Sequence, residues 1–195
     1  MKIVTLLGSP RPKGNSTIIA KHFCDKIQDL GASVQIFALN KMTYRGCQAC
    51  MTCKTKLDRC VLQDDLTEVL DALRDADVIV MATPVYFSDV TSQMKSFIDR
   101  VYSFLTPDYR ESSEKSRFSP GKTLVFIQVQ GRPDENKFAD IFPRYEEFFD
   151  WYGIEERHLI RAGGVRNLGE IEAHPEVFQQ AEEVAAKIMA GKDSP

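Results

Sequence analysis

Two short segments of the chain carry residues whose types and spacing suit chemistry. The first is a turn at residues 8–17 that reads Gly-Ser-Pro-Arg-Pro-Lys-Gly-Asn-Ser-Thr. The second has the spacing C-x2-C-x2-C-x6-C and consists of Cys47, Cys50, Cys53 and Cys60. The turn suits the binding of an anion, whereas a cysteine cluster in a chain without an export signal favours metal or redox chemistry over disulfides.

The turn at residues 8–17 lies between a strand and a helix. The first N–H groups of a helix are unpaired and carry partial positive charge, so they attract anions. Arg11 can form paired hydrogen bonds with a phosphate, and Gly14 lets the backbone turn where a Cβ would obstruct it. The turn matches neither G-x-G-x-x-G nor a Walker A loop. It predicts a terminal phosphate monoester site, and the plain alternative is a polar loop that caps a helix.

The cysteine segment leaves three uses open. Compact thiolate runs of this kind hold iron–sulfur clusters. A four-thiolate zinc site is a rival, although zinc more often uses two separated C-x2-C pairs. Free thiols without metal are the third option. Nearby cations would offset the negative charge of a cluster, and they are Arg45, Lys54, Lys56 and Arg59.

Strands and helices alternate along the chain and must position these segments. Apolar runs predict strands at 2–7, 33–39, 77–82, 122–129 and 156–161. Helical spacing predicts helices at 16–30, 64–74, 91–104, 135–152 and 175–190, with the cysteine segment 44–62 as a loop. Such alternation predicts an α/β fold with a parallel sheet covered on both faces. Residues 106–121 are predicted to be a surface excursion, and Pro143 to kink or interrupt its helix.

Loops at the carboxyl ends of parallel strands form the usual ligand site of an open α/β sheet. The loops after the first, third and fourth strands all emerge there, and the loop at 83–88 adds the flat apolar surfaces of Tyr86 and Phe87. The cysteine loop follows the second strand, so we expect it on the same face. Asp99 and Arg100 are expected to form structural hydrogen bonds near the 83–88 loop.

The sequence resembles the NADPH-dependent FMN reductases of the flavodoxin-like superfamily. The resemblance lies in Gly8-Ser9-Pro10-Arg11 with Gly14-Asn15-Ser16-Thr17, and in Thr83-Pro84-Val85-Tyr86-Phe87 followed by Gln93 to Arg100. It implies a flavodoxin-like three-layer sandwich whose five-stranded parallel sheet has the order 2-1-3-4-5, with FMN between the first and third strands. We expect one FMN-binding domain at 1–191 and a frayed tail at 192–195.

The resemblance also implies particular site residues. The FMN phosphate would be held by Ser9, Arg11, Asn15, Ser16 and Thr17. The isoalloxazine ring would be lined by Pro84, Val85, Tyr86, Phe87 and Ser88, with Gln130 and Gly131 nearby. No side chain is expected to act as a covalent catalyst, because FMN itself accepts hydride or single electrons.

The cysteine spacing resembles that of the iron–sulfur flavoproteins, which carry FMN and a 4Fe–4S cluster. It implies that Cys47, Cys50, Cys53 and Cys60 hold the cluster. The first hypothesis is therefore an iron–sulfur flavoprotein that passes electrons between a donor and an acceptor. The second is a cluster-free NAD(P)H-dependent FMN or quinone reductase, and the third is an electron carrier like flavodoxin.

Composition narrows the class of protein. The 195 residues carry a net charge of −3, which indicates neither nucleic-acid nor membrane binding and is less acidic than is usual for flavodoxins. The apolar run at the N-terminus is too short for a signal peptide, and no stretch is long enough to span a bilayer, so we expect a cytoplasmic protein. The partners are expected to be small-molecule or protein electron donors and acceptors. The resemblance implies a homodimer or homotetramer.

Overall fold

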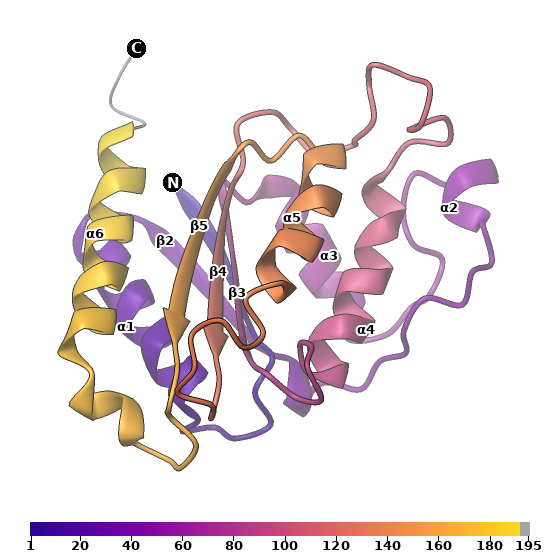
Figure 1. Ribbon diagram of the computed structural model, residues 1–195. Coiled ribbons are helices and arrows are strands. Elements are labelled where there is room, and N and C mark those ends of the chain that lie inside the picture. Colours follow the sequence, from indigo (N-terminus) through magenta and orange to yellow (C-terminus); the bar gives the residue numbers. More distant parts are fainter. Residues whose placement is uncertain (192–195) are drawn as a thin grey trace.

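The computed structural model describes residues 1–191 and contains a five-stranded parallel sheet (Figure 1). Its strands are β1 (Lys2–Leu7), β2 (Ser33–Ala38), β3 (Val78–Pro84), β4 (Thr123–Val129) and β5 (Glu156–Ala162). They lie in the order β2-β1-β3-β4-β5, which confirms the predicted flavodoxin-like topology. The tail predicted to fray, residues 192–195, lies outside the described residues.

The central strands end at nearly the same level. Leu7 of β1 pairs with Ala82 of β3, and Pro84 of β3 pairs with Val129 of β4. All residues of β4 are buried because helices cover both faces of the sheet, which accounts for its nearly continuous apolar sequence. This register brings the loops after β1, β3 and β4 together at one edge.

Helices α1 (Asn15–Asp29) and α6 (Pro175–Gly191) cover one face of the sheet, at the left of Figure 1. Ile19, Phe23 and Ile27 fall on one stripe of α1 and are fully buried against apolar strand residues. The apolar spacing of this segment is therefore confirmed at these three positions, whereas Ile18 is only partly buried and Leu30, at the end of the helix, is exposed.

The other face is covered by α3 (Leu66–Asp75), α4 (Ser92–Val101) and α5 (Ile141–Trp151), at the right of Figure 1. The shorter elements are α2 (Thr52–Thr55) and the 3₁₀ turns η1 (Leu39–Lys41), η2 (Tyr102–Phe104) and η3 (Glu170–Ala173). Within residues 1–191, none of the helices combines the length and apolar character needed to cross a bilayer.

Helix α5 begins six residues later than predicted. Asp134 accepts a hydrogen bond from the backbone N–H of Asn136 at 2.9 Å, and Phe138 has a left-handed backbone with φ of 65°. Both features keep the preceding segment in turns. Pro143 then falls in the first turn of the helix, where its missing N–H costs no intrahelical bond, so the predicted interruption does not occur.

The excursion at 106–121 folds back on the molecule. Thr106 donates its backbone N–H to the carbonyl of Lys115, and the side chains of Tyr109 and Phe118 are buried. Phe118 stacks on Phe104 with 4.2 Å between ring centroids. This segment therefore closes one end of the core around α4.

Candidate functional site

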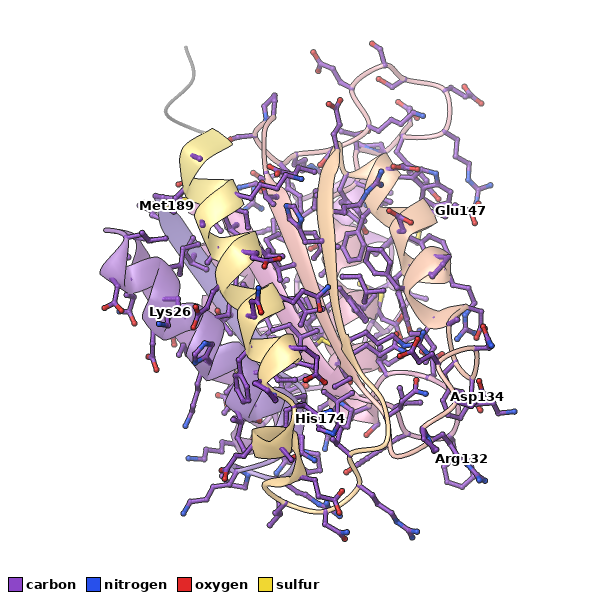
Figure 2. All side chains as sticks on the ribbon, turned by 60° about the vertical axis from the view of Figure 1, so that its left-hand side comes forward. Lys26, Arg132, Asp134, Glu147, His174 and Met189 are labelled. Carbon is purple, nitrogen blue, oxygen red and sulfur yellow. The ribbon has the colours of Figure 1, made fainter. Side chains whose placement is uncertain are left out.

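A cavity of about 590 Å³ opens beyond the carboxyl ends of the strands. Its walls come from the loops after β1, β3, β4 and β5, which is the usual ligand position in such a sheet. Figure 2 shows Arg132, which lines the cavity, at the opposite end of the molecule from Met189. The lining residues are Ser9, Arg11, Gly14, Asn15, Ser16, Pro84, Val85, Tyr86, Val129, Gly131, Arg132, Pro133, Phe138, Val165 and Arg166.

The turn after β1 is held in shape by its own short hydrogen bonds. Arg11 donates its backbone N–H to the hydroxyl of Ser9 at 3.1 Å, and its carbonyl accepts from the N–H of Gly14 at 2.9 Å. A Cβ on Gly14 would lie 2.6 Å from the Ser9 hydroxyl, which is too close for any other residue to fit without movement. Glycine is needed at this position for space.

The start of α1 offers a ready site for an anion. Gly14 is the N-cap and has no side chain to satisfy the first N–H groups of the helix, and no acidic residue occupies the first turn. The hydroxyl of Ser16 is buried in this turn, lines the cavity, and has no hydrogen-bond partner. A buried polar group without a partner is costly, so this hydroxyl fits a phosphate oxygen that accepts its hydrogen.

The turn is tied to the loop after β5, which the sequence did not suggest as part of the site. The Asn15 side-chain amide donates to the carbonyl of Asn167 at 2.8 Å, and the Arg11 guanidinium donates to that of Arg166 at 3.2 Å. Asn15 therefore acts on the protein backbone. In the sequence, Asn15 is a polar residue at the start of a helix, and this pattern is the same for a residue that binds a ligand and for one that holds a neighbouring loop.

The apolar wall of the cavity comes from the loop after β3. Val85 continues the sheet by donating its backbone N–H to the carbonyl of Val129 at 2.8 Å. Tyr86 and Asp89 then exchange two backbone hydrogen bonds around a tight turn at Phe87 and Ser88, which have φ values of 47° and 64°. This conformation is unusual for a bulky residue, and it leaves the Phe87 side chain fully exposed at the tip.

The cavity is electropositive. Arg11, Arg132 and Arg166 all line it, and among the described residues that form its walls none carries a carboxylate. Arg132 follows the predicted residues Gln130 and Gly131 in the loop after β4 but was not itself predicted, and Arg166 comes from the loop after β5, where the sequence indicated no ligand. The combination of three guanidinium groups, a helix N-terminus and an apolar wall fits a planar ligand with an attached phosphate.

Eight of the predicted flavin-binding residues line the cavity, whereas four do not. Those four are Thr17, Phe87, Ser88 and Gln130. Gln130 is buried and uses its amide to hold the loop after β4, because it donates to the carbonyls of Arg132 and Asp134 and accepts from Arg161. Gln130 therefore supports the loop that forms the cavity wall without lining the cavity itself.

The four clustered cysteines line a second, much smaller cavity. They are all free thiols and share its wall with Arg100 and Tyr102. The cavity measures about 20 Å³, which is room for about one water molecule. A cluster would require the exposed part of the loop around Cys47 and Cys50 to move outward. Within residues 1–191, no three His, Cys, Asp or Glu side chains form a group suited to a single metal ion.

Distant cations hold the cysteine loop in place. The Lys54 ammonium donates to the carbonyls of Tyr102 and Leu105, both at 2.6 Å. Arg117, from the excursion, donates to the carbonyl of Cys53 at 3.0 Å and also to that of Leu105. Of the predicted cations, Lys54 has this structural role, while Arg59 forms an ion pair with the neighbouring exposed Asp58.

The cysteine cavity lies away from the carboxyl-end cavity, and the expectation that the two share one face is wrong. The cysteine loop runs along α4, and its cavity contacts Arg100 and Ser103 at the far end of that helix. The start of α4 lies beside the carboxyl end of β1, where Thr91 donates its hydroxyl to the carbonyl of Gly8 at 2.8 Å. Ten helical residues span about 15 Å. Figure 1 shows α2 far from the strand ends.

The surroundings of Cys50, Cys53 and Cys24 shift the pKa values of their thiols in different directions. The hydroxyl and backbone N–H of Thr52 lower the pKa of the exposed Cys50 thiol. Burial raises the pKa of Cys53, and burial raises that of Cys24 on α1 to about 11. Cys24 is thus an inert core residue, whereas the loop cysteines span a range of thiol reactivity.

Comparison with known sequences identifies a family and several relatives. The model of the NADPH-dependent FMN reductase family matches residues 1–138. An iron–sulfur flavoprotein of Methanocaldococcus jannaschii is 32% identical over 164 residues, which cover 84% of this chain and 76% of that protein. Another, from Archaeoglobus fulgidus, is 33% identical over 69% of this chain and 58% of its own length. The chain spans about half the length of a further M. jannaschii relative, at 51%.

Solved structures share the fold at low sequence identity. An NAD(P)H:quinone oxidoreductase from Methanothermobacter marburgensis has a TM-score of 0.74 at 16% identity, with 95% of this chain and 94% of that chain covered. An FMN-dependent NADH-azoreductase from Bacillus anthracis, solved with FMN, has a TM-score of 0.71 at 15% identity, with 96% and 99% covered. These likenesses establish the flavodoxin-like architecture.

Proposed function

The chain belongs to the family of NADPH-dependent FMN reductases and iron–sulfur flavoproteins, and from this premise we propose that it is a flavin-dependent oxidoreductase that holds FMN in the carboxyl-end cavity. When bound, FMN supplies hydride and electron transfer. The observation that carries the assignment is the buried, unpartnered Ser16 hydroxyl at the N-terminus of α1. A phosphate oxygen is the acceptor that this position lacks.

The phosphate end of the ligand is held by charge and backbone. The start of α1 presents N–H groups, Ser16 donates its hydroxyl, and Arg11 stands at the rim as a cation. Gly14 keeps this turn compact, because a side chain there would meet the Ser9 hydroxyl. These residues bind and orient the ligand; none of them exchanges a proton with it.

The ring end of the ligand is held by shape. Pro84, Val85 and Tyr86 form the apolar wall, and the backbone bond between Val85 and Val129 keeps that wall in line with the sheet. A flat aromatic group packs on such a surface and excludes water. The exposed Arg132 lines the same cavity, and its charge would attract an anionic electron donor such as NAD(P)H.

We further propose that the cysteine cavity holds a 4Fe–4S cluster. The support is chemical: four thiols face one cavity, and Arg100 places an uncompensated N–H at its wall. Relatives named iron–sulfur flavoproteins share a third of their residues with this chain over the matched lengths. The electrons would then pass between small-molecule or protein partners through both groups.

A cluster-free NAD(P)H-dependent reductase is the second candidate. The observation that favours it is the tight cysteine cavity, whose volume of about 20 Å³ is far smaller than that of the flavin cavity. In this case the thiols stay free, and the flavin passes electrons directly to a small acceptor such as a quinone.

Anaerobic purification separates the two candidates. The visible spectrum, with iron and sulfide measured per chain, is expected to show flavin together with four irons and four sulfides for an iron–sulfur flavoprotein. Flavin without iron or sulfide would establish the second candidate. Failure to bind added FMN would contradict both. Oxidation of NAD(P)H with added quinone then tests the reductase activity, and light scattering tests the proposal of a homodimer or homotetramer.

A further inference from the structure

Arg100 is the largest of the fully buried side chains, and it lies near the end of α4 beside the cysteine cavity. Its two terminal nitrogens form a fork with the carboxylate of Asp64, at 2.8 and 3.2 Å. They also donate to the carbonyls of Arg45 at 2.8 Å and Leu62 at 3.3 Å. The guanidinium is therefore fixed in position by residues on both sides of the cysteine segment.

The third nitrogen of the same group has no partner. The Nε atom of Arg100 is buried and makes no hydrogen bond within the described residues, while Arg100 lines the cavity that all four cysteines share. An unsatisfied N–H of a charged group is expensive to bury. A group in the cysteine cavity that accepts this hydrogen would remove the penalty.

Cys60 is the sulfur best placed to accept. It is half-buried, lines the same cavity, and lies just before Leu62, whose carbonyl already contacts the guanidinium. Burial by itself lowers the pKa of Arg100, but Asp64 and Cys60 act in the opposite direction and raise it overall.

We propose that Arg100 is a positioning residue whose Nε–H, unpartnered in the ligand-free protein, donates to the sulfur of Cys60 when that sulfur is a thiolate or ligates a bound group. The bond fixes this sulfur in the cavity, and the charge of Arg100 offsets the charge of the thiolate or of the group it ligates. The proposal rests on the proposed function in one respect, which is that the group bound to Cys60 is a 4Fe–4S cluster.

The bond has a consequence for electron transfer. Reduction adds negative charge to a cluster, and hydrogen bonds to its sulfurs stabilise the more negative state. Arg100 therefore raises the reduction potential of a group bound at Cys60. A merely structural arginine would change the stability of the fold without changing this potential.

The test compares Arg100→Lys with the wild type in the anaerobically purified holoprotein. Lysine keeps the positive charge near Asp64 but lacks the Nε–H. The reduction potential, followed by electron paramagnetic resonance, is expected to shift to a more negative value, with unchanged iron and sulfide per FMN. An unchanged potential with a full cluster would overturn the proposal.

Arg117→Lys is the matched control. Arg117 holds the same loop without lining the cavity, because its guanidinium donates to backbone carbonyls, including that of Cys53. The same substitution there is expected to leave the potential near the wild-type value. An equal negative shift in both variants would assign the effect to the loop as a whole and overturn the specific role of Arg100.

A separate measurement decides the proposal if the wild type contains flavin but no iron or sulfide. That result removes the cluster from the proposed function, and the rate of Cys60 alkylation by iodoacetamide, measured by mass spectrometry, then tests the bond. The rate is expected to fall in Arg100→Lys relative to wild type and to Arg117→Lys. Equal rates in all three proteins would overturn the proposal.

A second probe covers failure of Arg100→Lys to fold. The Nε–H resonance of Arg100 in oxidised, ¹⁵N-arginine-labelled protein is expected to move in Cys60→Ser but not in Cys24→Ser, which changes a cysteine of α1 outside the cysteine cavity. A resonance that is the same in both variants would contradict the bond.

Discussion

The two cavities of this molecule are built in different ways. The flavin cavity is wide and open, and its phosphate end is shaped by the backbone of one turn and the start of one helix. The cysteine cavity is narrow, and its walls depend on Arg100 and Arg117, which lie far along the chain from the cysteines. The phosphate end of the flavin cavity is therefore formed by residues that are neighbours in the sequence, whereas the cysteine cavity depends on charged side chains from distant parts of the chain.

This difference has an energetic side. At the flavin cavity, the buried polar group that lacks a hydrogen-bond partner is the neutral hydroxyl of Ser16. At the cysteine cavity, the group that lacks a partner is the Nε nitrogen of Arg100, a buried cation that also forms an ion pair with Asp64. Losing the cation should therefore harm the fold, while losing groups at the flavin cavity should harm binding alone.

The largest expected effect is on folding. Arg100→Ala leaves the Asp64 carboxylate without its partner and should lower the free energy of unfolding by about 3–5 kcal/mol. Arg11→Ala removes an exposed side chain and should change it by less than about 0.5 kcal/mol. Urea denaturation of the ligand-free proteins measures both. An equal loss of unfolding free energy in Arg100→Ala and Arg11→Ala would contradict the proposed difference between the two cavities.

The next effect is on FMN affinity. Arg11→Ala should raise the Kd for FMN by roughly 10- to 100-fold, because a hydrogen bond to a charged group contributes about 1.5–3 kcal/mol. Lys13→Ala changes an exposed cation of the same turn that does not line the cavity, and it serves as the control. Titration followed by flavin fluorescence measures both constants. An equally large loss for the lysine variant would indicate general charge attraction.

A smaller effect distinguishes binding from stability at a single residue. Ser16→Ala removes the unpartnered hydroxyl and should stabilise the ligand-free protein by about 1 kcal/mol while it weakens FMN binding. Thermal unfolding with and without FMN measures the two changes. Loss of stability in the absence of FMN would mean that the hydroxyl has a partner within the protein.

The smallest effect is a dependence on pH. Burial raises the pKa of Asp64, but hydrogen bonds from Arg100 and from backbone N–H groups outweigh it and hold the pKa below its ordinary value. The ion pair therefore adds stability that is present above the unfolded-state pKa of about 3.9 and is lost as the pH falls through the folded-state value. Asp64→Asn should lose stability less steeply than wild type below about pH 4. Identical slopes in acid denaturation would contradict this.

The sequence predicted most of what depends on local pattern. Apolar runs located all five strands, and the turn at 8–17 pointed to the cavity because a glycine, short polar residues and a helix start suffice to form it. The helix boundaries were less accurate. The start of α5 depends on the turn formed by Asp134 and Asn136, which competes with the helical spacing of its aromatic residues.

Long-range contacts set the limits of that prediction. Arg100 was expected to act near the 83–88 loop, yet its hydrogen bonds go to Asp64, Arg45 and Leu62 at the other end of α4. Asp64, at which a helix was predicted to begin, forms an ion pair with it. The spacing of the cysteines gave no hint of where their loop would pack, because that depends on Lys54 and Arg117 reaching carbonyls of η2 and its neighbours.

The most direct test of the flavin site compares FMN with riboflavin, which is the same molecule without its phosphate. If the turn after β1 holds the phosphate, wild-type protein should bind FMN far more tightly than riboflavin, and Arg11→Ala should narrow this difference by weakening FMN alone. Equal affinities of the wild-type protein for FMN and riboflavin would contradict the account.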